Sequence, residues 1–446
     1  MSTTKSALKR PKVIIVGAGL GGVVLGALLE KAGIDFDIYE RATVVKPLGS
    51  AMAFGCNVMD LFRQLGIEEE FLSHAKPTYT LEVFNPQKET LMKFDNLEQE
   101  AKPIIYDMLL RLVPAKRLHL GKKVLSILTG ENGVMIRTAD GNSYEGDILV
   151  GADGAYSSVR QSLYERLKKD GNLPTSDSED LPYKYVSLVG QTMPLDPEEF
   201  PELKRDDSPF QCTVGDNKYS WTTFTTRANT ICYGAILTLD KATTKENDNF
   251  RNSEWGPEAA EQMCKQIKDF PVLSGDGTKT LNDLFELSPK HLISKVVLEE
   301  KIFKTWFSGR TVLLGDGAVC AMHDAVVLAN WINVLGHDST QEEVEKAFKE
   351  YKNERWPYVV QAYNHSQSNG HLIGSTFRGK FARWLVNHLP KSILEKSAVA
   401  HVGNRPRAAF LPPPPVRGSV KPDAQPSLTK TQAILAQQGR EAVVAV

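Results

Sequence analysis

The first hydrophobic stretch of the chain predicts a strand, a helix and a second strand. Residues 13–16 (VIIV) form a continuous β-branched run, which is typical of a parallel strand buried on both faces. After Gly22 the apolar positions recur at helical spacing (VVLGALLEKAG), and Gly33 is a plausible end signal for that helix. A second strand is expected at residues 35–39.

Three glycines and one acid stand at the junctions of this unit. Gly17, Gly19 and Gly22 form G-x-G-x-x-G, and Glu40 ends the second strand. Such glycines let the backbone turn tightly and approach a pyrophosphate at the helix N-terminus. A carboxylate ~20 residues farther on can accept hydrogen bonds from ribose hydroxyls. The pattern predicts an adenine dinucleotide site, with a merely structural strand–helix unit as the alternative, and by itself it does not separate NAD from FAD.

Farther along, the pattern indicates a second, sheet-rich region. Residues 184–238 contain short strands with little helix, which is typical of an antiparallel sheet and hence of a second domain. Residues 79–94 predict a hairpin that turns at Asn85 and Pro86. The other expected helices are 57–65, 102–112, 258–270, 281–287 and 341–370, and the other expected strands are 124–128, 134–138 and 311–314.

A second informative stretch covers residues 147–160 (DILVGADGAYSSVR). A short apolar strand runs into Asp153 and Gly154, and a helix starts near Ser157 and Arg160. A strand that ends in Asp-Gly can place a carboxylate and exposed amides at the phosphates or sugar of a cofactor. The alternative is an ordinary strand–turn–helix with a surface aspartate.

A third stretch, residues 309–334, repeats the design of strand, turn and helix. Gly315 and Asp316 follow its strand, and the helix carries His323 beside Asp324. We interpret these two as a polar pair on a helix face rather than a catalytic dyad, because neither a nucleophile nor a third group accompanies them.

Composition limits the function classes. The 446 residues suffice for two or three domains, and a net charge of −1 argues against a dominant nucleic-acid surface. The cysteines show no C-x-x-C pair and no metal-ligand spacing, so we expect free thiols in a reducing compartment, the cytoplasm, and no metal site. These cysteines are Cys56, Cys212, Cys232, Cys264 and Cys320.

We expect no membrane-spanning segment, because no apolar run reaches ~18 residues. Residues 380–394 are basic and amphipathic; they either pack on the domain or contact a membrane surface peripherally. From Gly403 onward the chain is Pro-rich, and we expect it to be disordered.

Together, the three stretches resemble the class A FAD-dependent aromatic hydroxylase superfamily. The family pattern is an N-terminal G-x-G-x-x-G, a central D-G-x-x-S-x-x-R and a late Gly-Asp before a helix, and the match covers roughly residues 11–370. Within the superfamily the chain is similar to fungal monooxygenases of secondary metabolism and to salicylate-hydroxylase-like enzymes.

The resemblance implies an α/β fold in which a Rossmann-like FAD-binding domain is joined to a mostly antiparallel β-sheet substrate domain and a C-terminal helical region. The expected boundaries are 11–75, 98–182 and 290–340 for the FAD-binding domain, 76–97 and 183–289 for the substrate domain, 341–400 for the helical region and 401–446 for a disordered tail.

The resemblance also implies roles for individual residues. The three motif glycines would hold the diphosphate of FAD, Glu40 would bind the adenosine ribose, and Arg41 would lie beside it. Lys102 stands where the family starts a helix with an arginine, and it supplies charge without the planar fork. The Asp153–Gly154 turn would touch both FAD and NAD(P)H, and Asp316 would contact the diphosphate–ribityl region. The candidate cofactor set is completed by Ala53, Arg160 and Gly317.

The chain departs from the family after Asp316. Family members continue into a Pro-containing, Gly-rich loop that lies against the flavin ring, whereas here Asp316 is followed at once by Gly317, Ala318 and Val319. This comparison suggests a deletion that would loosen FAD or expose the reduced flavin to water.

The function implied is a monooxygenase that uses FAD, NAD(P)H and O₂ to hydroxylate or epoxidise a small organic substrate. The cofactor carries that chemistry, so we assign no catalytic side chain. Tyr219, Trp221, Phe224 and Tyr233 either line the substrate pocket or form the sheet core. The alternatives are a flavin-binding remnant without turnover and a flavin or NAD oxidoreductase that does not insert oxygen.

Overall fold

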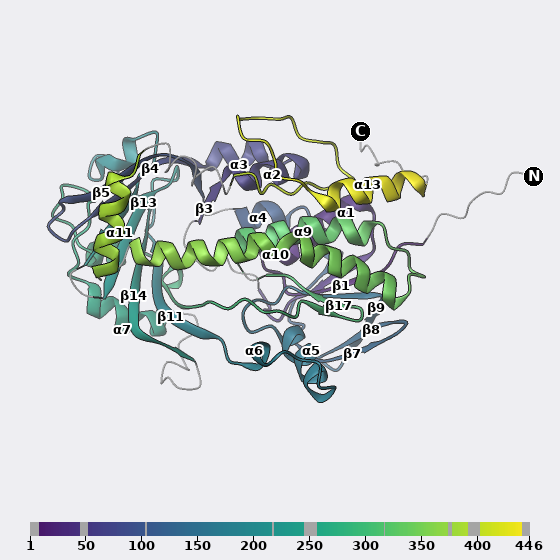
Figure 1. Ribbon diagram of the computed structural model, residues 1–446. Coiled ribbons are helices and arrows are strands. Elements are labelled where there is room, and N and C mark those ends of the chain that lie inside the picture. Colours follow the sequence, from purple (N-terminus) through teal and green to yellow (C-terminus); the bar gives the residue numbers. More distant parts are fainter. Residues whose placement is uncertain are drawn as a thin grey trace, which may run out of the picture.

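The computed structural model describes residues 9–44, 52–102, 105–215, 218–244, 257–315, 317–372, 377–390 and 402–438. Two sheets dominate the molecule, and helix α10 (Gln341–Leu372) runs from one to the other (Figure 1). At its far end the backbone of Gly370 lies against the Tyr185 hydroxyl of the second sheet.

The first sheet has six strands in the order β16-β17-β10-β1-β2-β6. Strand β1 (Val13–Val16) lies at its centre and pairs in parallel with β2 (Phe36–Tyr39) and β10 (Ile148–Gly151). All four residues of β1 are buried, as its apolar run predicts. The edge strands are β6 (Leu118–His119) and β16 (Phe307–Ser308), and β17 (Thr311–Leu313) lies between β16 and β10.

Helices cover one face of this sheet and a small sheet covers the other. Helix α1 (Leu20–Ala32) packs against α9 (Ala318–Asn333), and both share a core with Val13 and Ile15. Gly33 ends α1 in the left-handed conformation, as predicted. On the opposite face Ile14 and its neighbours pack against the sheet of β7 (Val124–Gly130), β8 (Gly133–Thr138) and β9 (Ser143–Gly146).

The second sheet has eight strands in the order β15-β11-β14-β13-β12-β4-β5-β3, and only the β12–β4 pair is parallel among its described pairings. Helices α7 (Pro257–Ile267) and α8 (Leu281–Glu286) cover one face. The strands are β3 (Met52–Gly55), β4 (Lys76–Phe84), β5 (Thr90–Lys102), β11 (Pro182–Gln191), β12 (Phe210–Val214), β13 (Tyr219–Thr225), β14 (Ile231–Thr244) and β15 (Ser294–Glu299).

These two sheets and the helices after residue 340 confirm the predicted fold class. The hairpin expected at 79–94 forms as β4 and β5. The remaining helices are α2 (Met59–Leu65), α3 (Glu68–His74), α4 (Ile105–Leu110), α5 (Ser158–Lys169), α6 (Thr175–Ser178), α11 (Phe377–His388) and α13 (Pro426–Gln437). Within the described ranges no helix is both long and apolar enough to cross a bilayer.

The helix expected from residue 102 is wrong at its start. Lys102 is the last residue of strand β5, where it pairs with Met52, and α4 begins only at Ile105. Backbone pairing with a strand distant in sequence overrides the local signal here.

The disorder expected for residues 401–446 is wrong for residues 402–438. This C-terminal strap (residues 402–438) lies across α2 and α9, with Ala408, Ala409 and Phe410 buried, and it ends in α13 (Figure 1). Backbone N–H groups of the strap donate hydrogen bonds to amide side chains of these helices. The Ala409 N–H donates to the side-chain oxygen of Asn330 at 2.7 Å. Composition alone does not reveal such long-range partners.

Candidate functional site

The glycine-rich loop is shaped by contacts that leave no space for most side chains. Gly17 has a φ of +104°, and a Cβ there would lie 2.4 Å from the Ala152 carbonyl oxygen. A Cβ at Gly22 would lie 2.1 Å from the Gly17 carbonyl oxygen. Gly19 differs, because a Cβ there would meet only the Ala152 oxygen at 3.9 Å. Two of the glycines are therefore required by the loop itself, and the third leaves open space.

That space lies at the N-terminus of α1. The first intrahelical hydrogen bond runs from the Val23 N–H to the Gly19 oxygen at 2.9 Å, so the preceding N–H groups point outward at the helix end. The first turn of α1 contains no acidic residue. A helix end of this kind favours an anion such as a phosphate.

Glu40 and Tyr106 hold the loop from either side. The Glu40 carboxylate accepts hydrogen bonds from the Ala18 N–H at 2.9 Å and the Ala42 N–H at 2.8 Å. The Tyr106 hydroxyl donates to the Ala18 oxygen at 2.6 Å. Burial and the nearby Glu40 charge raise the pKa of Tyr106, so it remains a donor. Tyr106 was not among the predicted site residues, since nothing local links it to a loop 88 positions away.

The second motif meets the first at the carboxyl edge of the parallel strands. The Ala152 N–H bonds to the Val16 oxygen at 2.8 Å, and a Cβ on Gly17 would lie 2.8 Å from the Cα of Asp153. Gly154 follows in the left-handed conformation, with open space where a Cβ would be. Ligands of open α/β sheets bind at this edge.

The side chains of the second motif turn toward their own helix. Asp153 accepts from the Ser157 hydroxyl at 2.5 Å and the Ser158 N–H at 2.6 Å, and it thereby caps α5. Arg160 donates to the Ala155 oxygen at 2.6 Å and lies over the Phe303 ring at 4.4 Å. The motif thus has a capping role that the sequence analysis missed, while contact of Asp153 or Arg160 with a cofactor stays a prediction.

The third motif is held by a buried ion pair. The Gly315 N–H donates to the Asp324 carboxylate at 2.9 Å, and the other oxygen of Asp324 accepts from the Arg355 Nε at 2.7 Å. Both charged side chains are 1% exposed. Gly317 is the N-cap of α9, so the helix begins two residues after Asp316, which itself lies outside the described residues.

His323 and Asp324 hydrogen-bond to different partners. The Nε2 of buried His323 lies 3.0 Å from the Asn57 oxygen, whereas Asp324 bonds to Arg355 and Gly315. Burial and the nearby Arg355 charge lower the pKa of His323 to about 3, so the imidazole is neutral at ordinary pH. The pair anchors two segments near the third motif and lacks the arrangement of a catalytic dyad.

Three other residues were predicted to bind the cofactor: Arg41, Ala53 and Lys102. Arg41 follows Glu40 and is exposed. Ala53 in β3 pairs with Ala101, and Lys102 is next to it in β5, so these segments are neighbours despite their separation in sequence. Lys102 is not on the helix for which it was proposed.

The four aromatic candidates divide between the two faces of the eight-stranded sheet. Tyr219, Trp221 and Tyr233 pack with α7 and α8, where Tyr233 bonds to the Ser288 hydroxyl at 3.0 Å. Phe224 points to the other face and stacks on Phe210 with ring centroids 5.6 Å apart. The sheet-core alternative therefore describes the first three.

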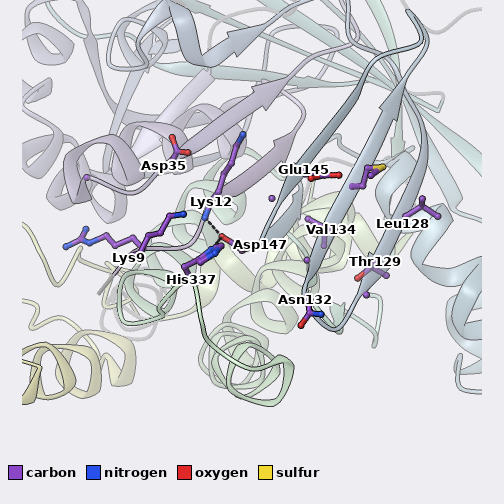
Figure 2. Close-up of a pocket in the computed structure, with 16 residues that line it drawn as sticks. Lys9, Lys12, Asp35, Leu128, Thr129, Asn132, Val134, Glu145, Asp147 and His337 are labelled. Carbon is purple, nitrogen blue, oxygen red and sulfur yellow. Dashed lines mark hydrogen bonds and ion pairs between the residues drawn. The ribbon is translucent and has the colours of Figure 1, made fainter. Parts of the chain in front are cut away.

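A groove of about 900 Å³ lies at the opposite edge of the parallel sheet. Figure 2 shows Lys12, Asp147 and His337 on one wall and the hairpin residues Val134 and Thr129 on the other. His337 Nδ1 lies 2.9 Å from Asp147, which also accepts from the Lys12 N–H at 2.7 Å. Because these residues precede the strands, the groove is distinct from the glycine-rich edge.

No group of three metal-ligating side chains occurs among the described residues. None of the five cysteines forms a disulfide in the structure. Burial raises the pKa of the Cys212 thiol to about 12 and that of Cys264 to about 11, so both remain protonated. Neither is poised as a nucleophile.

Comparison with known proteins agrees with this geometry. A family model described as FAD binding domain matches residues 10–181. The FAD-dependent monooxygenase ausM of Aspergillus calidoustus is 26% identical, over 94% of this chain and 92% of the relative. The chain is thus similar to fungal FAD-dependent monooxygenases over most of its length. The monooxygenase verC1 of Penicillium polonicum is 29% identical over 77% of this chain, but the match spans only 44% of that relative's length.

Solved flavoproteins share the fold of this chain. HpxO of Klebsiella pneumoniae, solved with FAD and uric acid, covers 89% of this chain and 97% of its own, with a TM-score of 0.68 and 18% identity. The residues described here fit FAD at its diphosphate end, because Gly19 leaves space over the α1 N-terminus and Glu40 borders the same loop.

Proposed function

We propose that this chain uses FAD, NAD(P)H and O₂ to hydroxylate or epoxidise a small organic substrate. The observation that carries the proposal is the convergence of the Gly17–Gly22 loop and the Asp153–Gly154 turn at one edge of the parallel sheet. When bound, FAD supplies the redox and oxygen chemistry, and the protein supplies binding, orientation and exclusion of water.

The cofactor is held chiefly by backbone groups. The outward N–H groups at the α1 N-terminus bind the diphosphate over Gly19, and Glu40 binds the adenosine ribose while it fixes Ala18. Arg41 contributes positive charge beside it. Asp316 and Gly317 complete the site toward the flavin, and the Gly154 turn provides exposed backbone for the nicotinamide cofactor.

The substrate is bound on the sheet face that carries Phe224. Phe210 and Phe224 form a stacked aromatic surface there, and the buried Cys232 lies beside Phe224 on the neighbouring strand. The opposite face is filled by α7 and α8 and offers no comparable surface. An apolar organic molecule fits such a wall better than a charged one.

A flavin-binding protein without turnover is the second candidate. It is favoured by the direct passage from Asp316 to the N-cap Gly317, where the family has a loop against the flavin ring.

We also propose a cytoplasmic location. The five cysteines form no disulfide in the structure, which supports a reducing compartment.

The test begins with the absorbance spectrum of the purified protein. A yellow protein with an oxidised-flavin spectrum, which consumes NADPH when substrate is supplied and incorporates ¹⁸O from ¹⁸O₂, supports the monooxygenase. Flavin binding without NADPH consumption supports the second candidate, and NADPH consumption with unlabelled product indicates a non-oxygenating oxidoreductase. Colourless protein that takes up no added FAD contradicts every candidate that depends on a flavin.

A further inference from the structure

Helix α11 (Phe377–His388) packs with one side against the sheet face that also carries Phe210 and Phe224, over strands β4, β5 and β12 (Figure 1). Val386 packs on a cluster formed by residues of β4, β5 and β12. The Asn387 amide donates to the Leu91 oxygen at 2.9 Å, and Arg383 is buried. The helix therefore has a defined orientation relative to the sheet.

The opposite face presents large apolar side chains to solvent. Phe377 is 83% exposed, Phe381 55%, Trp384 53% and Leu385 41%. Their spacing of four, three and one residues places them on one side of the helix. Phe381 stacks on Trp384, and Trp384 stacks on His388 with centroids 4.5 Å apart. A contiguous patch of this kind marks an interaction surface.

The segment of sequence that contains this helix is rich in basic residues. Residues 377–396 contain five basic side chains and one acidic side chain, Glu395, although the whole chain has a net charge of −1. Lys380 is exposed beside the aromatic residues. The basic residues are Arg378, Lys380, Arg383, Lys391 and Lys396.

We propose that α11 docks the protein on the surface of an anionic lipid bilayer. The helix lies in the plane of the interface, with Phe377, Phe381 and Trp384 inserted at the boundary of headgroups and acyl chains. Tryptophan and phenylalanine on one face with lysines alongside are the features that bind such an interface. The exposed Lys380 adds attraction to anionic headgroups.

Lipid explains the combination of features better than a protein partner does. The patch is a convex row on one short helix, whereas protein partners recognise helices through grooves or paired apolar stripes. The positive charge specifies an anionic occupant, and the aromatic side chains specify an apolar layer beneath it. A single 12-residue helix in the interface gives reversible attachment and is too short to span the bilayer.

The test is sedimentation of the FAD-loaded, full-length protein with vesicles. We expect binding to vesicles of equimolar phosphatidylcholine and phosphatidylserine and weaker binding to pure phosphatidylcholine, with a blue shift of tryptophan fluorescence as Trp384 enters the interface. The double variant Phe381→Ser/Trp384→Ser should lose at least about tenfold in affinity, because it removes two large apolar contacts.

The matched control is Tyr79→Ser/Val416→Ser, which removes two exposed apolar side chains elsewhere. It should bind vesicles like the parent, and Lys380→Glu should lower binding to the anionic vesicles only. Equal binding by parent and α11 double variant would overturn the proposal, as would absence of binding to either vesicle. Concentration-dependent dimerisation that the α11 variant abolishes, without vesicle binding, would assign the patch to a second copy of the chain.

Discussion

The glycine-rich loop and the Gly315 turn both lie where parallel strands end, but they are stabilised differently. The loop is held by close backbone packing between Gly17 and Gly22 and against Ala152 at the end of the neighbouring strand. The Gly315 turn depends on Asp324, which depends on Arg355, which in turn contacts Asn404 of the C-terminal strap at 3.2 Å. The first part of the site thus depends chiefly on tight backbone packing, and the second depends on a chain of charged and polar side chains that ends in the strap.

The largest effect should come from breaking the buried ion pair. Arg355→Leu leaves the Asp324 carboxylate buried without its cation, which should destabilise the protein by about 3–5 kcal/mol. Urea denaturation measures this loss. Asp324→Leu/Arg355→Leu is the control and should recover part of it, because no lone charge remains. A single variant as stable as the parent would show that the pair does not support the turn.

Gly19→Val should separate cofactor binding from folding. The free protein has room for a side chain at Gly19, but that side chain would occupy the space proposed for the diphosphate. We expect FAD affinity to fall by about a hundredfold or more, ~3 kcal/mol, with little change in the melting temperature of the free protein.

Gly22→Val is the matched variant. Because a Cβ there would lie 2.1 Å from the Gly17 oxygen, it should lower both stability and binding. Calorimetric titration with FAD and thermal melting of the free protein distinguish the two outcomes. Full flavin occupancy in Gly19→Val would contradict the position that we propose for the diphosphate.

His323, which is buried near the Gly315 turn, makes the stability of the protein sensitive to acid. Its pKa is lowered to about 3 by burial and Arg355, so the native state resists protonation that the unfolded chain accepts near its ordinary pKa of 6.5. The stabilisation is therefore complete above pH 6.5 and declines as the pH falls, by about 2 kcal/mol at pH 5.

His323→Gln, which keeps a donor for the Asn57 oxygen, should flatten this part of the stability profile. Urea denaturation at pH 7.5 and pH 5 measures the difference. An identical pH dependence in parent and variant would mean that another group is responsible.

The separation in sequence between interacting residues explains which features could be predicted from the sequence. β1, α1 and β2 were predicted because apolar runs, glycines and Glu40 lie within one short stretch. The strap was missed because its partners are remote: Arg407 contacts Asp60 at 2.7 Å, 347 positions away. Pairing between β3 and the end of β5 likewise placed Lys102 in a strand. Local patterns contain no information about such partners.

Substitution of Glu40 should give the smallest effect, and it tests whether this carboxylate supports the glycine-rich loop as well as the cofactor. Its carboxylate accepts from the N–H groups of Ala18 and Ala42, so Glu40→Ala removes both the ribose partner and a support of the loop. Glu40→Gln keeps an acceptor oxygen but removes the charge. We expect the free energy of FAD binding to weaken by about 1 kcal/mol in Glu40→Gln and by about 2 kcal/mol in Glu40→Ala.

The comparison of these two variants separates the two roles of Glu40. If the carboxylate acts only on the ribose, Gln and Ala should weaken FAD binding equally, and the melting temperature of the free protein should not change. If it also supports the loop, Ala alone should lower that melting temperature, since two backbone N–H groups lose their acceptor. Equal FAD affinity in parent and both variants, measured by calorimetry, would remove Glu40 from the site and leave the loop held by its glycines and Tyr106.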